Sequence, residues 1–255
     1  MTDVFTVDTA LRSVETPTNA LMRRVDIEAL AERAHAHDIT VAVDNTFATP
    51  YLQQPLAHGA DLVLHSATKY LGGHSDLILG AVCTNSDEWA EKLRFQIKST
   101  GAAPGPMDCF LTLRGTKTLH LRMEQHCSSA RRLAQMLNAH DKVGHVRYPG
   151  LPSHPGHALA QKQMSGYGGM ISFELADDEM DKALAVLDAA EVFTLAESLG
   201  GVESLIEHPA SMTHASIPAE EREKIGLTDS LIRLSVGVES FEDLRDDLDR
   251  ALSRV

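Results

Sequence analysis

The chain has 255 residues, a length that predicts one large domain or two domains of modest size. Its composition, with 43% hydrophobic and 23% charged residues, is typical of globular proteins and excludes a mainly disordered or collagen-like chain. The 23 basic and 36 acidic residues give a net charge of −13, which argues against nucleic acid or an anionic membrane surface as the partner.

Neither the start of the chain nor its apolar segments indicate export or a membrane. Residues Met1–Val4 lack the basic and apolar regions that open a signal peptide. No apolar run approaches the roughly 20 residues that a bilayer-spanning helix needs. The three cysteines, Cys83, Cys109 and Cys127, form no C-x-x-C pair and leave an odd thiol, a pattern typical of a reducing cytoplasm. We therefore predict a cytoplasmic protein with no membrane partner.

The first ninety residues predict alternating helices and strands. A helix is expected over Asp26–His37 with Asp26 as its N-cap, because apolar residues recur there at helical spacing. A second, shorter helical stretch follows Thr49. Strands covered on both faces are expected at three continuous apolar runs, Ile39–Val43, Leu62–Leu64 and Leu77–Thr84. This order indicates a mainly parallel sheet whose chemistry lies beyond the carboxyl ends of its strands.

The middle of the chain predicts a loop followed by a long helix. Residues Ser99–Pro106 are dense in glycine and proline and are expected to form the loop. A helix is predicted over Met107–Asn138, interrupted by Gly115, with basic residues interleaved among leucines and methionines at helical spacing. We favour an amphipathic helix that connects two domains over a basic stripe for nucleic acid.

The last part of the chain indicates a smaller α+β domain. Strands are predicted over Met170–Leu175, Val192–Ala196 and Leu231–Val238, and helices over Asp178–Ala190 and Phe241–Ser253. The last helix opens on the capping-box pattern Ser240-x-x-Asp243. We predict two domains, residues 1–135 with the linking helix and residues 136–255.

Two of the predicted strands are followed by residues that point to chemistry. One strand ends in Asp44, and the next is followed by hydroxyl residues around Lys69, so parallel strands would bring both to one sheet edge. The Lys69 amine suits a Schiff base with the aldehyde of pyridoxal phosphate (PLP). Ser66 and Thr68 would then bond the phosphate, and Asp44 would hold the ring nitrogen protonated. A surface lysine, with Asp44 as a turn or cap residue, is the alternative that the spacing leaves open.

Arg233 differs from the other arginines because it lies within the apolar run Leu231–Val236. A charge in such a run is costly unless it meets a partner. A buried or cleft arginine suits bidentate binding of a carboxylate. Strand alternation would instead place Arg233 on an exposed face, and the pattern alone leaves both interpretations open.

The remaining motifs are weak. His154 and His157 are spaced like metal ligands but have no nearby cysteine or carboxylate, so we expect no metal site. The glycines after Gly166 fail the G-x-G-x-x-G test because residue 171 is isoleucine, which disfavours a dinucleotide-binding domain.

Several segments in the same order along nearly the whole chain resemble the Cys/Met-metabolism family of PLP enzymes. They are Glu15–Asn19, Val43–Pro50, His65–Asp76, Leu195–Glu203 and Ile232–Glu239. The resemblance implies an α/β PLP-dependent transferase of the aspartate aminotransferase-like fold type I. We expect a partial large domain with a mainly parallel sheet and a smaller C-terminal α+β domain.

The resemblance implies which residues hold the cofactor, PLP. Lys69 is expected to form the Schiff base and later to move protons at the substrate carbons. Asp44 is expected to pair with the pyridine nitrogen, and Ser66 and Thr68 to bond the phosphate. Asn19 is expected beside the 3-oxygen of the ring and the substrate carboxylate.

The resemblance also implies the substrate and the assembly. Arg233 with Ser198 is expected to hold the carboxylate of a small amino acid, either cystathionine or an O-acylhomoserine, for γ-elimination or γ-replacement. We favour the branch of cystathionine γ-synthase and cystathionine γ-lyase. Cystathionine β-lyase, methionine γ-lyase and O-acylhomoserine sulfhydrylase are the alternatives within the family. A homodimer or homotetramer is expected.

The N-terminal part departs from the family pattern. Members carry a longer leading segment with a phosphate loop, a tyrosine stacked on the ring and a Tyr/Arg pair that reaches the neighbouring subunit. In this sequence Met1 precedes the Glu15 segment by only a few residues. A second hypothesis is therefore a truncated, catalytically incompetent member that acts only as a fragment or oligomer partner.

Overall fold

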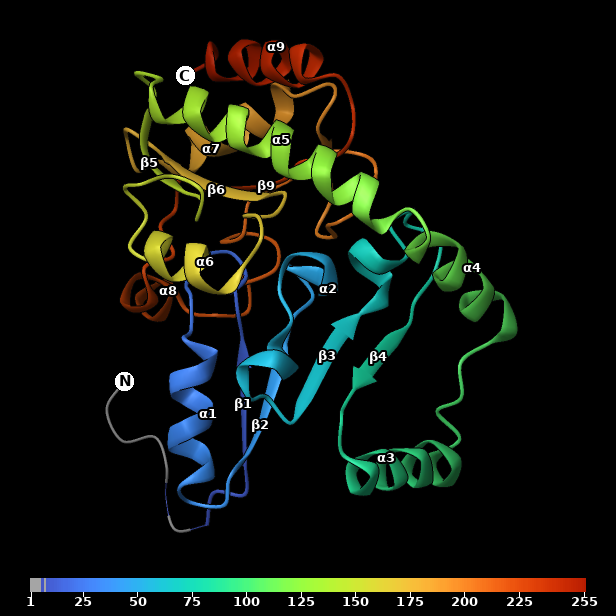
Figure 1. Cartoon of the computed structure of the whole chain (residues 1–255). Coiled ribbons are helices and arrows are strands. Elements are labelled where there is room, and N and C mark those ends of the chain that lie inside the picture. The colour runs from blue at the N-terminus through green and yellow to red at the C-terminus, as the bar shows by residue number, and fades with distance from the viewer. Residues whose placement is uncertain (1–5, 7) are drawn as a thin grey trace.

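The computed structural model describes residue 6 and residues 8–255, which form two β-sheets with helices around them (Figure 1). The first sheet has the strand order β1-β2-β3-β4, with β1 (Leu11–Glu15), β2 (Thr40–Asp44), β3 (Leu62–Ser66) and β4 (Gly80–Cys83). The second has the order β5-β6-β9-β8-β7, with β5 (Val143–Arg147), β6 (Met170–Leu175), β7 (Thr194–Leu195), β8 (Leu205–Glu207) and β9 (Leu231–Ser235).

The helices connect and flank these strands. The α-helices are α1 (Ile27–His35), α2 (Thr49–Leu52), α3 (Asp87–Thr100), α4 (Pro106–Thr116), α5 (Leu119–Asn138), α6 (His157–Gln163), α7 (Met180–Ala189), α8 (Ala219–Ile225) and α9 (Phe241–Leu252). Two shorter helical turns are η1 (Pro55–His58) and η2 (Ala67–Leu71). Among the described residues, no helix combines the length and the apolar character needed to cross a bilayer. All three cysteines are free.

The first sheet has the parallel arrangement that the sequence predicts. Strands β1, β2 and β3 pair in parallel, so their carboxyl ends meet at one edge. The N-cap role of Asp26 is confirmed, because its side chain accepts a hydrogen bond from Ala29 N at 3.1 Å. The third predicted strand, Leu77–Thr84, is only partly correct. Strand β4 is shorter, runs antiparallel to β3 and is largely exposed, because within the described sheet it lies at an edge.

The long helix predicted after the loop is divided in two. The break falls at residues 117–118, between α4 and α5, and Gly115 lies inside α4. Gly115 serves close packing instead, because a Cβ there would lie 2.7 Å from Leu71 O and would overlap Gly72 O. Arg122 of α5 stays buried beside this contact and donates to Tyr70 O at 2.6 Å and Gly115 O at 2.8 Å. The backbone after β3 is thus fixed by direct contact with α4 and α5.

The second sheet is mostly antiparallel, with only β7 and β8 paired in parallel, as an α+β arrangement requires. The predicted strands and helices of this part are present; β6 has the predicted bounds, and the others are shorter. The prediction of a capping box at the last helix is wrong, because the Ser240 side chain makes no capping hydrogen bond to the backbone of α9. Its hydroxyl instead donates to the Glu242 carboxylate at 3.3 Å, which satisfies the side chain locally.

Helix α5 packs against both parts of the molecule and runs along the second sheet (Figure 1). Met123, near its start, belongs to an apolar cluster with Tyr70 and Met170. Leu133, further along, belongs to a separate cluster with Phe173 and Ile232. The boundary after residue 135 stays a prediction, since one continuous helix contributes to both cores.

Gly115→Ala should destabilise the protein by about 1–3 kcal/mol, because the added methyl group overlaps backbone that cannot move away. The measurement is the free energy of unfolding in urea. Gly80→Ala is the matched control, because a Cβ there meets nothing within 4 Å, and its effect should stay within about 0.5 kcal/mol. Equal stability of both variants would contradict the close packing of α4 on η2.

Candidate active site

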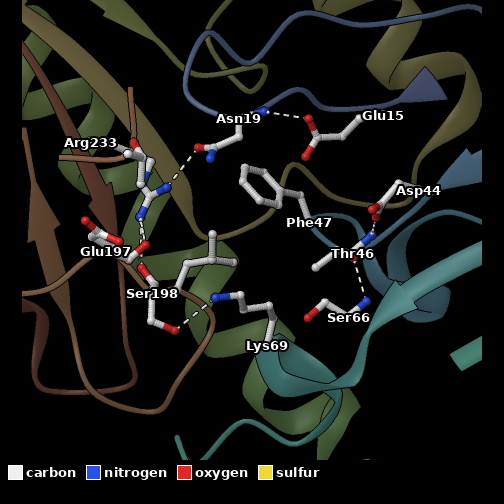
Figure 2. A pocket seen from close by; sticks show the side chains of 12 residues that line it. Glu15, Asn19, Asp44, Thr46, Phe47, Ser66, Lys69, Glu197, Ser198 and Arg233 are labelled. Atoms are coloured by element: carbon white, nitrogen blue, oxygen red, sulfur yellow. Dashed lines mark hydrogen bonds between the residues drawn. The ribbon is translucent and has the colours of Figure 1, made fainter. Parts of the chain in front are cut away.

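A cavity of about 520 Å³ lies beyond the carboxyl ends of β1, β2 and β3, and residues of the second sheet complete it (Figure 2). Its lining residues are Glu15, Asn19, Asp44, Thr46, Phe47, Ser66, Lys69, Glu197, Ser198, Leu199, Thr213 and Arg233. The predicted residues Asn19, Asp44, Ser66, Lys69, Ser198 and Arg233 are therefore brought together.

Lys69 enters the cavity from η2, the helical turn that directly follows β3. The backbone at Lys69 leaves helical geometry, with φ −91° and ψ −132°. The ammonium group donates a hydrogen bond to Ser198 Oγ at 3.0 Å (Figure 2). Burial lowers the pKa of Lys69, and the charge of Arg233 lowers it further. A larger share of the amine is therefore neutral, and hence nucleophilic, near pH 7 than for an exposed lysine.

Asp44 and Ser66 reach the cavity from neighbouring parallel strands. Asp44 Oδ1 accepts a hydrogen bond from Thr46 N at 2.9 Å, and Thr46 Oγ1 accepts one from Ser66 N at 2.8 Å. Thr46 therefore connects the ends of the two strands. The prediction that Asp44 and Lys69 share one sheet edge is confirmed by the parallel pairing of β2 with β3 and by the common cavity.

Thr68 is the predicted site residue that the structure leaves out of the lining. Its hydroxyl accepts a hydrogen bond from Leu79 N at 3.1 Å and joins η2 to the segment before β4. This contact supports the backbone on which Lys69 sits.

Arg233 is buried, with a side chain only 1% exposed, which excludes the interpretation of an exposed strand face. Its Nη1 lies 2.8 Å from Glu207 Oε1 and donates to Asn19 Oδ1, also at 2.8 Å. Its Nη2 donates to the carbonyl oxygens of Glu197 at 2.8 Å and Ser198 at 2.9 Å. The guanidinium therefore holds together strand β8, the loop at Glu197 and Ser198 and the segment after β1.

Glu207 is the charged partner that sequence reasoning missed. It lies on β8 directly across from Arg233 on β9, and its side chain is fully buried. Burial raises its pKa, which the Arg233 charge and a hydrogen bond from Thr213 Oγ1 partly oppose. A glutamate at the end of a short apolar run is the only signal, and a three-residue strand is too short to show a period.

The side chains present fit PLP. Lys69 supplies an amine for an aldehyde, Asp44 a carboxylate for a protonated ring nitrogen, and Ser66 a hydroxyl for a phosphate. The buried guanidinium of Arg233 adds positive charge at the opposite side of the cavity. The cavity volume also lies within the roughly 300–1,000 Å³ typical of small-molecule sites.

Comparisons with known proteins agree with this chemistry. The model of the Cys/Met metabolism PLP-dependent enzyme family matches residues 1–253, and the chain belongs to this family. Cystathionine γ-lyase of Dictyostelium discoideum is 53% identical over 252 residues, covering 99% of the chain and 65% of that protein. Cystathionine β-lyase of Lactococcus lactis subsp. cremoris MG1363 is 59% identical over 240 residues, covering 94% and 63% respectively.

The solved structures confirm the fold prediction. Cystathionine γ-lyase from Lactobacillus plantarum, complexed with L-serine, superposes with a TM-score of 0.96 at 46% identity. The match covers 99% of this chain and 66% of that one. The fold is therefore that of the PLP-dependent transferases of fold type I, and the family's cofactor is PLP. The chain spans less than two thirds of the length of these relatives.

Glu207→Ala should destabilise the protein by about 3–5 kcal/mol, because it leaves the Arg233 charge buried without its counter-charge. The free energy of unfolding measures this loss. Glu242→Ala is the control, since it removes the exposed partner of Arg132 and should cost no more than about 1 kcal/mol. A small effect at Glu207 would show that other groups carry the charge of Arg233.

Proposed function

We propose that this chain carries the Lys69 half of a PLP-dependent transsulfuration site that acts on cystathionine or an O-acylhomoserine, by γ-elimination or γ-replacement. The observation that carries the proposal is one cavity that holds the Lys69 amine, the Asp44 carboxylate and the buried Arg233 guanidinium together. Family membership supports the same reaction class, and the relatives named above are cystathionine lyases.

In this proposal, Lys69, Asp44 and Ser66 divide the binding of the cofactor. Lys69 holds it covalently through Nζ, Asp44 keeps a proton on the ring nitrogen, and Ser66 donates to the phosphate. PLP, when bound, supplies a conjugated ring that accepts electrons from a bond at the substrate α-carbon. Once the substrate amine has displaced Lys69, the freed Nζ takes the proton from the α-carbon. The same amine then returns this proton to a substrate atom beyond the α-carbon. The lowered pKa of Lys69 favours the neutral amine that this step needs.

Arg233 and Asn19 orient the amino acid through its carboxylate. The Nη1 and Nη2 groups of Arg233 already donate to Asn19, the Glu197 and Ser198 carbonyls and the Glu207 carboxylate. Among the described residues Nε of Arg233 has no partner, whereas a carboxylate that binds the Nη groups must displace one acceptor. Asn19 is the acceptor whose side chain lines the cavity. Rotation of the Asn19 amide would free Nη1 of Arg233 and would turn the NH₂ group of Asn19 towards the carboxylate. The cationic Arg233 guanidinium and the neutral Asn19 amide would then both donate to the carboxylate and fix its orientation.

The branch of cystathionine γ-synthase and γ-lyase is the proposed one. Cystathionine β-lyase, methionine γ-lyase and O-acylhomoserine sulfhydrylase activities are the alternatives within the family. Assays of the PLP-loaded protein with cystathionine or methionine alone, and with acylated homoserines plus cysteine or sulfide, distinguish them. The eliminations differ in the keto acid or the thiol that they release, and the replacements consume the thiol or sulfide and release the acyl group as a carboxylic acid.

We also propose that the chain works in the cytoplasm as a homodimer or homotetramer. Support for self-association comes from large apolar side chains on α4 that lie exposed, namely Met107, Phe110 and Leu113. Exposed apolar groups of this kind commonly mark protein interfaces.

A fragment without activity of its own is the second candidate function. The observation that favours it is the length, since the chain covers 63–66% of the relatives described above. Such a fragment would act only as a partner in an oligomer with longer copies. It predicts a folded chain that does not retain PLP.

Lys69→Ala tests the assignment of Lys69 and distinguishes the proposal from the inactive fragment. The unmodified chain, mixed with PLP and reduced with borohydride, should carry one stable adduct on the peptide that contains Lys69. The variant should carry none there, because the nucleophilic amine is gone. Lys98→Ala, at an exposed lysine of α3, is the control and should behave like the unmodified chain. Equal labelling of Lys69→Ala would contradict the assignment of Lys69, and absence of labelling in a folded chain would favour the fragment.

A further inference from the structure

A second cavity of about 520 Å³ lies away from Lys69, between the segment that precedes α1 and the second sheet with the loop before α6. The two cavities share no lining residue. The polar side chains around the second cavity are basic or imidazole groups, namely Arg23, Arg24, His145, Arg147 and His154. None of the described residues that line it is acidic, although the chain as a whole has a net charge of −13.

Arg24 is the least satisfied cation of this cavity. Its Nε and Nη1 atoms are buried and have no hydrogen-bond partner among the described residues. Within the same part of the chain, its Nη2 donates to uncharged atoms, the sulfur of Met164 and, at 3.4 Å, Gln53 Oε1. Burial lowers the pKa of Arg24 to about 10, and the group still stays charged near pH 7. A buried cation without a counter-ion is unfavourable, so the arrangement calls for an anion.

The neighbouring groups do not neutralise the charge of Arg24. Arg147 is already paired, with Nη1 at 2.6 Å from Glu174 Oε1. Burial, with the charges of Arg24 and the nearby histidines, lowers the pKa of His154 to about 4, so this ring is neutral near pH 7. Arg23 is exposed and donates to an uncharged group, Ile225 O at 2.6 Å, so water also solvates its charge. Arg24 is therefore the cation that lacks a counter-charge among the described residues.

An ion pair and close contacts connect the two sides of the second cavity. Lys162 of α6 pairs with Glu28 of α1 at 2.8 Å, which connects the two sides of the cavity. Gly156 lets the Arg24 stem approach, because a Cβ at this position would lie 2.5 Å from Arg24 Cγ. His154 Nδ1 accepts from Gly156 N at 3.0 Å, which fixes the ring beside the guanidinium.

We propose that this cavity binds a small phosphate-type dianion, held mainly by Arg24 with Arg23. Guanidinium groups match phosphate oxygens through their planar set of N–H donors, and the anion supplies the counter-charge that Arg24 lacks. The exposed Arg23 adds a second positive charge beside it. The neutral ring of His154 can add a hydrogen bond without further charge. The ligand is either free phosphate or the phosphate group of a small metabolite, and it binds independently of the chemistry at Lys69.

Calorimetric titration of the full chain with inorganic phosphate tests the proposal, with sodium chloride of matched ionic strength as the blank. Arg24→Gln should weaken phosphate binding by about 10-fold or more. Arg94→Gln removes the same charge from an exposed position of α3 and should bind like the unmodified chain. A parallel titration with glycerol 3-phosphate separates the sources, because tighter binding of the ester indicates a phosphorylated metabolite and equal or weaker binding indicates free phosphate.

Thermal unfolding distinguishes a binding site from a structural role. Without phosphate, Arg24→Gln should be at least as stable as the unmodified chain, because an unpaired buried charge is removed. Phosphate should then raise the melting temperature of the unmodified chain but not of the variant. Equal phosphate affinity in both proteins would overturn the proposal. So would binding that survives Arg24→Gln but is lost in Ser66→Ala, because it would place the anion in the Lys69 cavity and leave the proposed function standing.

Discussion

The buried ion pair between Arg233 and Glu207 is the interaction on which the site depends. It is formed across two antiparallel strands of the second sheet, and the same guanidinium reaches Asn19, 214 positions away in the sequence. A charge buried this deeply must be compensated, so its acceptors are constrained to their positions. The loop at Glu197 and Ser198 and the segment after β1 are thereby held against one another. Without this network the cavity would lose one of its walls.

The other side of the cavity depends on how the chain leaves β3. Lys69 lies on a helical turn that α4 and α5 contact directly, through Gly115 and Arg122. Thr68 adds a hydrogen bond to Leu79 from the same turn. These contacts fix the backbone at Lys69, and the amine lies within hydrogen-bonding distance of Ser198 Oγ. Its lowered pKa follows from the burial that this placement imposes and from the Arg233 charge across the cavity.

The positions of Asp44, Lys69 and Arg233 could be predicted because each depends on a local pattern. Apolar runs that end in Asp44 and before Lys69 specify parallel strands with a common edge. The charge inside the run of β9 singles out Arg233, although the pattern leaves burial and exposure open and the structure decides for burial. Glu207 could not be predicted, because its strand is too short to carry a pattern and its partner lies on another strand. Helix α3 was missed since it buries no residue. The basic cavity at Arg24 joins residues distant in sequence, which no local pattern connects.

The proposed PLP site at Lys69 lies between the two sheets. A crystal structure of the chain grown with PLP is its strongest test. We expect continuous electron density from Lys69 Nζ to the cofactor, with Asp44 at the ring nitrogen and Ser66 at the phosphate. Density for PLP elsewhere, or a Lys69 side chain still bound only to Ser198 in crystals saturated with PLP, would contradict it.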